Sequence, residues 1–174
     1  MRQFERFPNL VTMFFTRARE GGDKPFLWRK VETAWRPISW VETARQVAAV
    51  AEGLKRLGLK RGDRVMLVSE NRPEWCIADL AIMAAGCVTV PTYTTNTERD
   101  HLHILENSGA AAVIVSTEKL AKTLLPAVMR SNEARHVIAM EPLRIQQAGT
   151  IAFHDWGSLL ATEADVGAVA AAAD

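Results

Sequence analysis

Residues 64–91 read RVMLVSENRPEWCIADLAIMAAGCVTVP, and this stretch decides the fold. Residues 65–69 form a short apolar run that predicts a strand. Residues 73–85 predict a helix with proline at its first position, where no amide hydrogen is needed. Residues 87–90 predict a second strand, which Pro91 ends. A strand, a helix and a second strand in this order indicate a βαβ crossover and therefore parallel strands.

The same alternation continues towards the C-terminus. A Thr95-x-x-Glu98 pattern predicts a capping box at the start of the next helix, and Pro126 is expected to bend or break a later one. The further elements are a helix at 95–108, a strand at 111–115, a helix at 118–130 and a strand at 136–140. Four apolar strands separated by three helices are typical of a mostly parallel sheet.

Three elements are predicted before this alternation begins. They are a helix at 9–19, a hairpin of strands at 26–31 and 34–38, and a helix from the Ser39-x-x-Glu42 capping box to Gly58. The fold class is therefore α/β, with a mostly parallel sheet of βαβ units preceded by a helix, a β-hairpin and a second helix. The helix at 73–85 is apolar nearly all round, which predicts burial on more than one side.

The signals weaken after Met140. Residues 151–154 predict a short strand, and residues 155–160 predict a helical turn. Residues 164–174 are rich in alanine and offer few large side chains to bury. This stretch is interpreted as a linker or a fraying helix.

Composition excludes several classes of protein. The chain has 174 residues, and 21 basic against 20 acidic residues give a net charge of +1. This balance predicts no nucleic acid partner. A peripheral membrane contact is possible but has no support in the sequence. The only cysteines, Cys76 and Cys87, form no CxxC pair, so a disulfide framework and a cysteine-rich zinc site are excluded. No signal peptide is apparent at the start of the chain. These features predict a cytoplasmic location.

The turns that follow the predicted strands do not suit phosphate. The turn from Ser69 to Pro73 has no glycine to let the backbone approach a ligand, Pro73 lacks an amide donor, and Glu70 adds negative charge. Neither GxGxxG nor GxxxxGK[ST] occurs in the chain. An independent dinucleotide-binding or P-loop module is therefore not expected.

Other candidate groups favour structural roles. His101 and His103 are two residues apart, which points them to different sides of a helix and disfavours one shared metal. Glu70, Arg72 and Glu74 are interpreted as a capping and ion-pair network rather than an acid–base pair. A basic cluster, likewise assigned to helix ends and turns, comprises Lys55, Arg56, Lys60, Arg61 and Arg64. The residues themselves thus predict a scaffold with no catalytic, cofactor-binding or metal-binding side chain.

A resemblance to a known family covers about residues 9–140. The Ser-Glu-Asn-Arg-Pro-Glu-Trp run at 69–75, the Gly-Asp-Arg-Val run at 62–65 and the Ala-Gly-Cys-Val-Thr-Val-Pro run at 85–91 occur in one order. Together they resemble the N-terminal part of the adenylate-forming acyl-CoA synthetases, most closely the long-chain fatty acyl-CoA ligases. The resemblance implies that residues 1–163 form the N-terminal part of the large adenylate-forming domain.

That family activates a carboxylate with ATP and magnesium and passes the acyl group to coenzyme A. The resemblance therefore implies ATP, magnesium and CoA for a full-length enzyme, a fatty acid as its substrate, and the rest of the same polypeptide as partner. The family's phosphate-binding loop, its aromatic-Gly-x-Thr-Glu segment, its ribose-binding aspartate and its C-terminal lysine have no counterpart here. Residues 164–174 are accordingly expected to lead towards the missing loop, and the chain is expected to be an inactive, self-associating fragment.

Two alternatives remain open from the sequence. The parent could be another adenylating enzyme, acting on a short-chain, aryl or amino acid. The chain could also be a short α/β interaction module without enzymatic activity, for which the apolar helix at 73–85 would supply an assembly surface.

Overall fold

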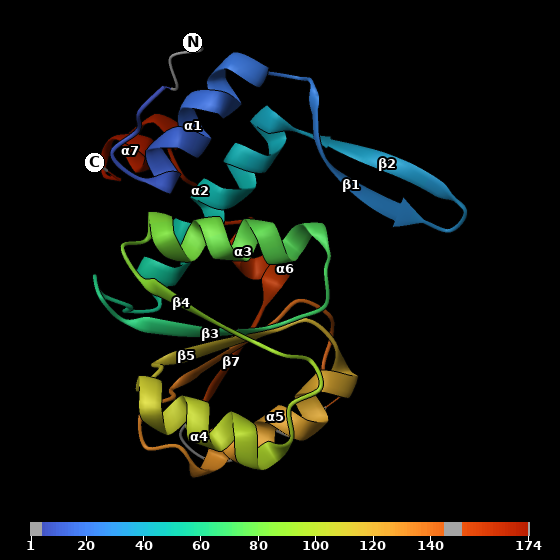
Figure 1. Ribbon diagram of the computed structural model, residues 1–174, viewed down its shortest axis with the longest axis vertical. Coiled ribbons are helices and arrows are strands. Elements are labelled where there is room, and N and C mark those ends of the chain that lie inside the picture. Colours follow the sequence, from blue (N-terminus) through green and yellow to red (C-terminus); the bar gives the residue numbers. More distant parts are fainter. Residues whose placement is uncertain (1–4, 145–150, 174) are drawn as a thin grey trace.

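The computed structural model describes residues 5–144 and 151–173 and has the predicted α/β architecture (Figure 1). In chain order its elements are α1 (Leu10–Gly21), β1 (Pro25–Val31), β2 (Ala34–Ser39), α2 (Trp40–Arg56), β3 (Arg64–Val68), α3 (Pro73–Ala84), β4 (Val88–Thr92), α4 (Glu98–Ser108), β5 (Ala112–Val115), α5 (Glu118–Arg130), β6 (His136–Ala139), β7 (Ala152–Asp155), α6 (Trp156–Leu160) and α7 (Val166–Ala171). One parallel sheet has the strand order β4-β3-β5-β6-β7, and β1 pairs with β2 in a separate antiparallel hairpin.

The parallel sheet is buried on both faces because alternate residues of each strand enter different helix layers. Leu67 of β3 packs in a core with residues of α1, α2, α3 and α6, whereas its neighbour Met66 packs in a second core with residues of α4 and α5. The same alternation places Ile114 and Ile138 in the first core and Val113 and Val137 in the second. Continuous apolar runs are what a sheet covered on both sides requires.

Helix α3 lies between the sheet and the outer helices α1 and α2 (Figure 1). Its buried residues include Ile77 and Ile82 together with the small residues Ala78 and Ala81, which let neighbouring helices approach closely. The prediction that this helix is buried on more than one side is therefore confirmed.

The hairpin extends away from the helical body (Figure 1). Its turn places Glu32 at φ 53°, in the left-handed region that non-glycine residues seldom adopt. Trp28 pairs with Pro37 and Lys30 pairs with Trp35, so the two tryptophans lie diagonally on one face of the hairpin. They are 50% and 62% exposed, respectively.

Three details differ from the sequence-based expectations or add to them. The capping box of α4 is formed by Thr97 and not Thr95, because the Asp100 carboxylate reaches back to the backbone N–H and hydroxyl of Thr97. Helix α5 continues through Pro126 without a break. The weakly signalled strand at 151–154 is confirmed as β7, which pairs in parallel with β6.

Part of the alanine-rich stretch is helical and packs on the body. Asp165 caps α7 by accepting hydrogen bonds from the backbone N–H groups of Gly167 and Ala168, at 2.7 and 3.1 Å. Val169 is buried against the same core as α1 and α2. Asn9 Nδ2 donates to the carbonyl oxygen of Ala173 at 2.6 Å, which joins the start of α1 to the end of α7.

The packing of Gly21 against Trp40 generates a test of this arrangement. A Cβ added at Gly21 would lie 2.4 Å from Trp40 Cδ1, and Trp40 is held by stacking on Phe26 with ring centroids 3.6 Å apart. We expect Gly21→Ala to lower the free energy of unfolding by about 1–3 kcal/mol through overpacking. Urea denaturation followed by circular dichroism measures the loss.

The matched control is Gly157→Ala in α6, where an added Cβ meets nothing within 4 Å. It should leave stability unchanged or raise it by up to about 1 kcal/mol, because alanine is the better helix former. Equal denaturation midpoints for the two variants would contradict the proposed close packing of Gly21.

Candidate functional site

The carboxyl ends of β3 and β5 lie where open α/β sheets commonly bind a ligand. From β3 the chain passes to α3 on one face of the sheet, and from β5 it passes to α5 on the other. In open α/β sheets a crevice forms where two neighbouring strands send their connections to opposite faces. Here the position of such a crevice lies between Ser69–Arg72 after β3 and Ser116 and Thr117 after β5.

This crevice is bridged by side chains of the chain itself. The buried Ser116 hydroxyl donates a hydrogen bond to Glu70 Oε2, and Ser69 Oγ donates to the Glu70 carbonyl oxygen at 2.9 Å. Partial burial opposes ionisation of Glu70, but the hydrogen bond from Ser116 and the positive charge of Arg72 outweigh it and lower the pKa of the carboxyl. Glu70 is therefore held as a carboxylate across the crevice.

Arg72 and Glu74 extend the network to two other elements. Arg72 Nε donates to Glu74 Oε2 at 2.9 Å, and Arg72 Nη1 donates to Glu141 Oε1 at 2.7 Å just beyond β6. The nearly buried Glu74 carboxylate also forms an ion pair with Arg29 of the hairpin. The Arg72–Glu74 part of the predicted network is thus present, and it ties the hairpin, α3 and the end of β6 together. Glu70 bonds Ser116 instead of an arginine, and no side chain caps α3.

These contacts decide what the crevice can do chemically. The two arginines are each engaged by a carboxylate, and the carboxylates of Glu70, Glu74 and Glu141 repel an incoming anion. Pro73 at the first position of α3 offers no amide hydrogen to a phosphate. The residues present therefore do not fit the phosphates of ATP or of CoA, and no chemical step is assigned to them.

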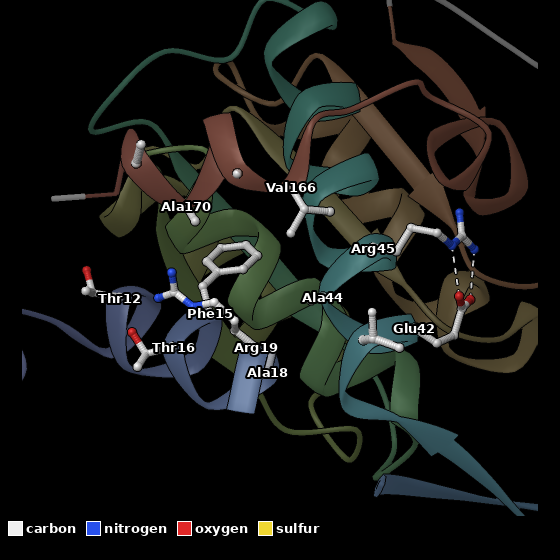
Figure 2. Close-up of a pocket in the computed structure, with 13 residues that line it drawn as sticks. Thr12, Phe15, Thr16, Ala18, Arg19, Glu42, Ala44, Arg45, Val166 and Ala170 are labelled. Atoms are coloured by element: carbon white, nitrogen blue, oxygen red, sulfur yellow. Dashed lines mark hydrogen bonds and ion pairs between the residues drawn. The ribbon is translucent and has the colours of Figure 1, made fainter. Parts of the chain in front are cut away.

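A groove of about 700 Å³ lies between α1, α2 and α7 (Figure 2). Its walls are mainly apolar, with Phe15, Ala44 and Val166 facing the opening. Charged groups lie at its margin, where both oxygens of Glu42 accept hydrogen bonds from Arg45 at 2.8 Å. The lining also includes Thr12, Thr16 and Arg19, but its one carboxylate is Glu42, which Arg45 engages.

The structure separates one pair of histidines and joins another. His101 is buried in α4 and His103 is exposed on the same helix, as their spacing predicts. His136 and His154 meet, with 3.1 Å between His136 Nδ1 and His154 Nε2. Sequence reasoning missed this pair because the register of β6 and β7 creates it.

Within residues 5–144 and 151–173, no group of three or more His, Cys, Asp or Glu side chains is arranged to hold a metal.

Three members of the basic cluster make structural contacts: Lys55, Arg56 and Arg64. Arg64 donates to the carbonyl oxygens of Ser108 and Gly109 at 2.7 and 2.8 Å, which satisfies the C-terminus of α4. Lys55 and Arg56 both pair with Glu52, at 3.9 Å.

Among the helices that the structure describes, none combines the length and the apolar character needed to span a membrane.

The two cysteines are unreactive in this environment. Neither Cys76 nor Cys87 forms a disulfide in the described structure. Burial raises the pKa of both thiols, and nearby Asp79 and Asp63 add to the effect at Cys76 and Cys87, respectively. A protonated thiol is a poor nucleophile, so neither residue is a candidate for covalent catalysis.

Comparison with known proteins gives concordant results for family and fold. Residues 14–165 match the family model of the AMP-binding enzymes. The chain is 37% identical over 113 residues to the long-chain-fatty-acid–CoA ligase FadD15 of Mycobacterium tuberculosis, covering 65% of this chain and 19% of that protein. It is 33% identical over 135 residues to a long-chain-fatty-acid–CoA ligase of Salmonella typhimurium, covering 77% of this chain and 23% of that protein.

Solved structures show the same fold. The acetoacetyl-CoA synthetase from Streptomyces lividans superposes with a TM-score of 0.76 at 25% identity, covering 89% of this chain and 25% of that one. A benzoate CoA ligase from Burkholderia xenovorans superposes with a TM-score of 0.74 at 23% identity, covering 91% and 29%, respectively. The chain spans about a fifth of the length of the curated relatives named above.

The bridge between Ser116 and Glu70 generates a pH-dependent prediction. Because the folded state lowers the pKa of Glu70, its contribution to stability is present above the unfolded pKa of about 4.3 and is lost as pH falls through the folded value. Ser116→Ala should raise the Glu70 pKa towards its ordinary value. Because Glu70 is exposed and solvent screens its charge, the cost at pH 7 should be below about 1 kcal/mol. The cost should shrink towards zero as Glu70 becomes protonated.

Carbon-13 NMR titration of the Glu70 carboxyl, together with denaturation at several pH values, measures both effects. Ser108→Ala is the matched control, since Ser108 Oγ donates to a backbone carbonyl oxygen of its own helix, that of Ile104. A Glu70 titration curve that is the same in the Ser116 variant and the unmodified chain would refute the bridge.

Proposed function

The chain belongs to the family of AMP-binding enzymes, and we propose that it is the N-terminal part of a ligase that joins long-chain fatty acids to coenzyme A. The observation that carries the proposal is the 33–37% identity to long-chain-fatty-acid–CoA ligases from two bacteria. In the proposed reaction the parent enzyme uses ATP to convert the fatty acid into an acyl-adenylate and then forms the thioester with CoA.

Within that enzyme we assign this chain the role of a scaffold. Residues 1–163 would form the N-terminal part of the large domain, and residues 164–174 would lead towards the phosphate-binding loop. The side chains at the ends of β3 and β5 support this assignment, because Glu70 and Ser116 bond each other and Arg72 is engaged by Glu141, which leaves no free positive charge there for a nucleotide. ATP, magnesium, CoA and the fatty acid would be bound by residues elsewhere in the polypeptide, and we assign no catalytic residue to this chain. We propose a cytoplasmic location for the parent.

The test is an acid-dependent ATP–pyrophosphate exchange assay on the parent polypeptide that contains this chain. A panel of palmitate, octanoate, butyrate, benzoate and an amino acid distinguishes a long-chain fatty acid ligase from other adenylating enzymes. We expect exchange to be fastest with palmitate and absent for the 174-residue chain alone. Preference for benzoate or butyrate would overturn the long-chain assignment, and exchange by the isolated chain would overturn its assignment as a scaffold.

The exposed hairpin supports a proposal about partners. Trp28 and Trp35 lie on one face of a two-stranded ribbon, an element that is marginally stable in water by itself. We propose that the rest of the polypeptide covers this face in the parent, and that the isolated chain self-associates through it. Large exposed apolar patches on a soluble chain commonly mark such contacts.

The molar mass from light scattering, measured over a range of protein concentrations, tests whether the isolated chain self-associates through the hairpin. The isolated chain should grow in mass with concentration, and a Trp28→Ser/Trp35→Ser variant should remain monomeric. Tyr93→Ser is the control, because Tyr93 is 80% exposed on the connection between β4 and α4. A strictly monomeric mass for the unmodified chain would contradict self-association.

A further inference from the structure

His136 and His154 lie on neighbouring parallel strands and on the same face of the sheet. In the register of β6 and β7, Ile138 lies opposite His154, and His136 lies opposite Ala152. Side chains two residues apart on a strand share a face, as do side chains at paired positions, so both imidazoles lie on the side of Ile138. The two-residue offset lets the rings meet end to end rather than stack.

The ring geometry brings two nitrogen atoms together. His136 Nδ1 and His154 Nε2 are 3.1 Å apart, and the ring centroids are 5.3 Å apart at an interplanar angle of 37°. Without a metal, one of these nitrogens donates its hydrogen to the other. Both residues are half-buried, so each keeps part of its surface accessible to solvent.

We propose that His136 and His154 form a two-imidazole binding site for a late first-row divalent cation such as zinc. Two ligands at a Zn–N distance of about 2.0–2.1 Å and a tetrahedral angle are separated by about 3.3 Å. The nitrogens therefore need to move apart by about 0.2 Å, and the rings need to turn so that both lone pairs point at the cation. Imidazole favours zinc, nickel and copper over magnesium and calcium, which take oxygen ligands.

Burial favours the neutral form of both imidazoles, which is the form that binds a metal. Burial lowers the pKa of His136, with the positive charges of His154 and Arg135 acting in the same direction. Burial also lowers the pKa of His154, against the smaller opposing effect of Asp155. Both rings are consequently neutral near pH 7, and protons compete only weakly with a metal for their lone pairs.

Metal binding requires a change of tautomer but no change in charge or oxidation state. The hydrogen between the two rings must leave the facing nitrogen and return, through solvent, to the far nitrogen of the same ring. His136 then carries its hydrogen on Nε2 and His154 on Nδ1, and both facing lone pairs point at the cation. Two further tetrahedral positions are left for water.

The other two histidines offer no comparable site. His103 is exposed on α4 and His101 is buried, and their spacing separates them on the helix. The metal would join β6 to β7, the strand at the end of the described sheet. A ligand that binds only the folded state stabilises it, so zinc should raise the melting temperature of the chain.

Calorimetric titration of the 174-residue chain with zinc chloride tests the proposal. We expect one zinc per chain, no heat with magnesium chloride, and binding at least about tenfold weaker in His136→Gln and in His154→Gln. His103→Gln is the matched control and should bind as the unmodified chain does. Unchanged affinity in both pair variants, or no zinc binding by the unmodified chain up to millimolar concentration, would overturn the site.

A second measurement requires no variant and so does not depend on how the substitutions affect folding. Zinc should protect His136 and His154 from modification by diethyl pyrocarbonate, as read by mass spectrometry of peptides, while His103 stays reactive. Equal modification of the pair with and without zinc would also overturn the site.

Discussion

Burial of both faces of the parallel sheet is the constraint on which the rest of this structure depends. Alternate residues such as Met66 and Leu67 enter two different cores, so helices must cover each face. Helix α3 is then enclosed between the sheet and the outer helices, which explains why it carries apolar residues nearly all round. The small residues Ala78 and Ala81 allow that close packing, and a polar residue at either position would be buried without a partner.

The same constraint creates the crevice and explains why a likeness of fold implies no chemistry here. Because α3 and α5 must cover opposite faces, the connections after β3 and β5 diverge and leave a gap at the edge of the sheet. In this chain Glu70 and Ser116 bond each other at this position, and Arg72 pairs with Glu74 and Glu141. The position is therefore typical of a ligand site, while the side chains that occupy it stabilise the fold.

Local sequence signals predicted most elements, and contacts distant in sequence account for what they missed. Ser39 and Pro73 marked helix starts correctly because capping and the missing amide of proline act within a few residues. The sequence favours Thr95 as the N-cap of α4, whereas the structure uses Thr97. Both fit the spacing of a capping box, since an acidic residue follows each threonine by three positions: Glu98 and Asp100, respectively. The pairing of His136 with His154 depends on the register between β6 and β7, which are separated by residues 140–151, and periodicity does not encode that register.

Titration of the folded 174-residue chain with magnesium–ATP, followed by NMR chemical shifts, tests the central claim most directly. If the crevice is filled by the Glu70–Ser116 bridge and this chain is a scaffold, no residue should shift along a saturable curve. Saturable shifts at Ser69–Arg72 and at Ser116 and Thr117 would contradict the account, because they would place a nucleotide at the edge that the carboxylates are said to close.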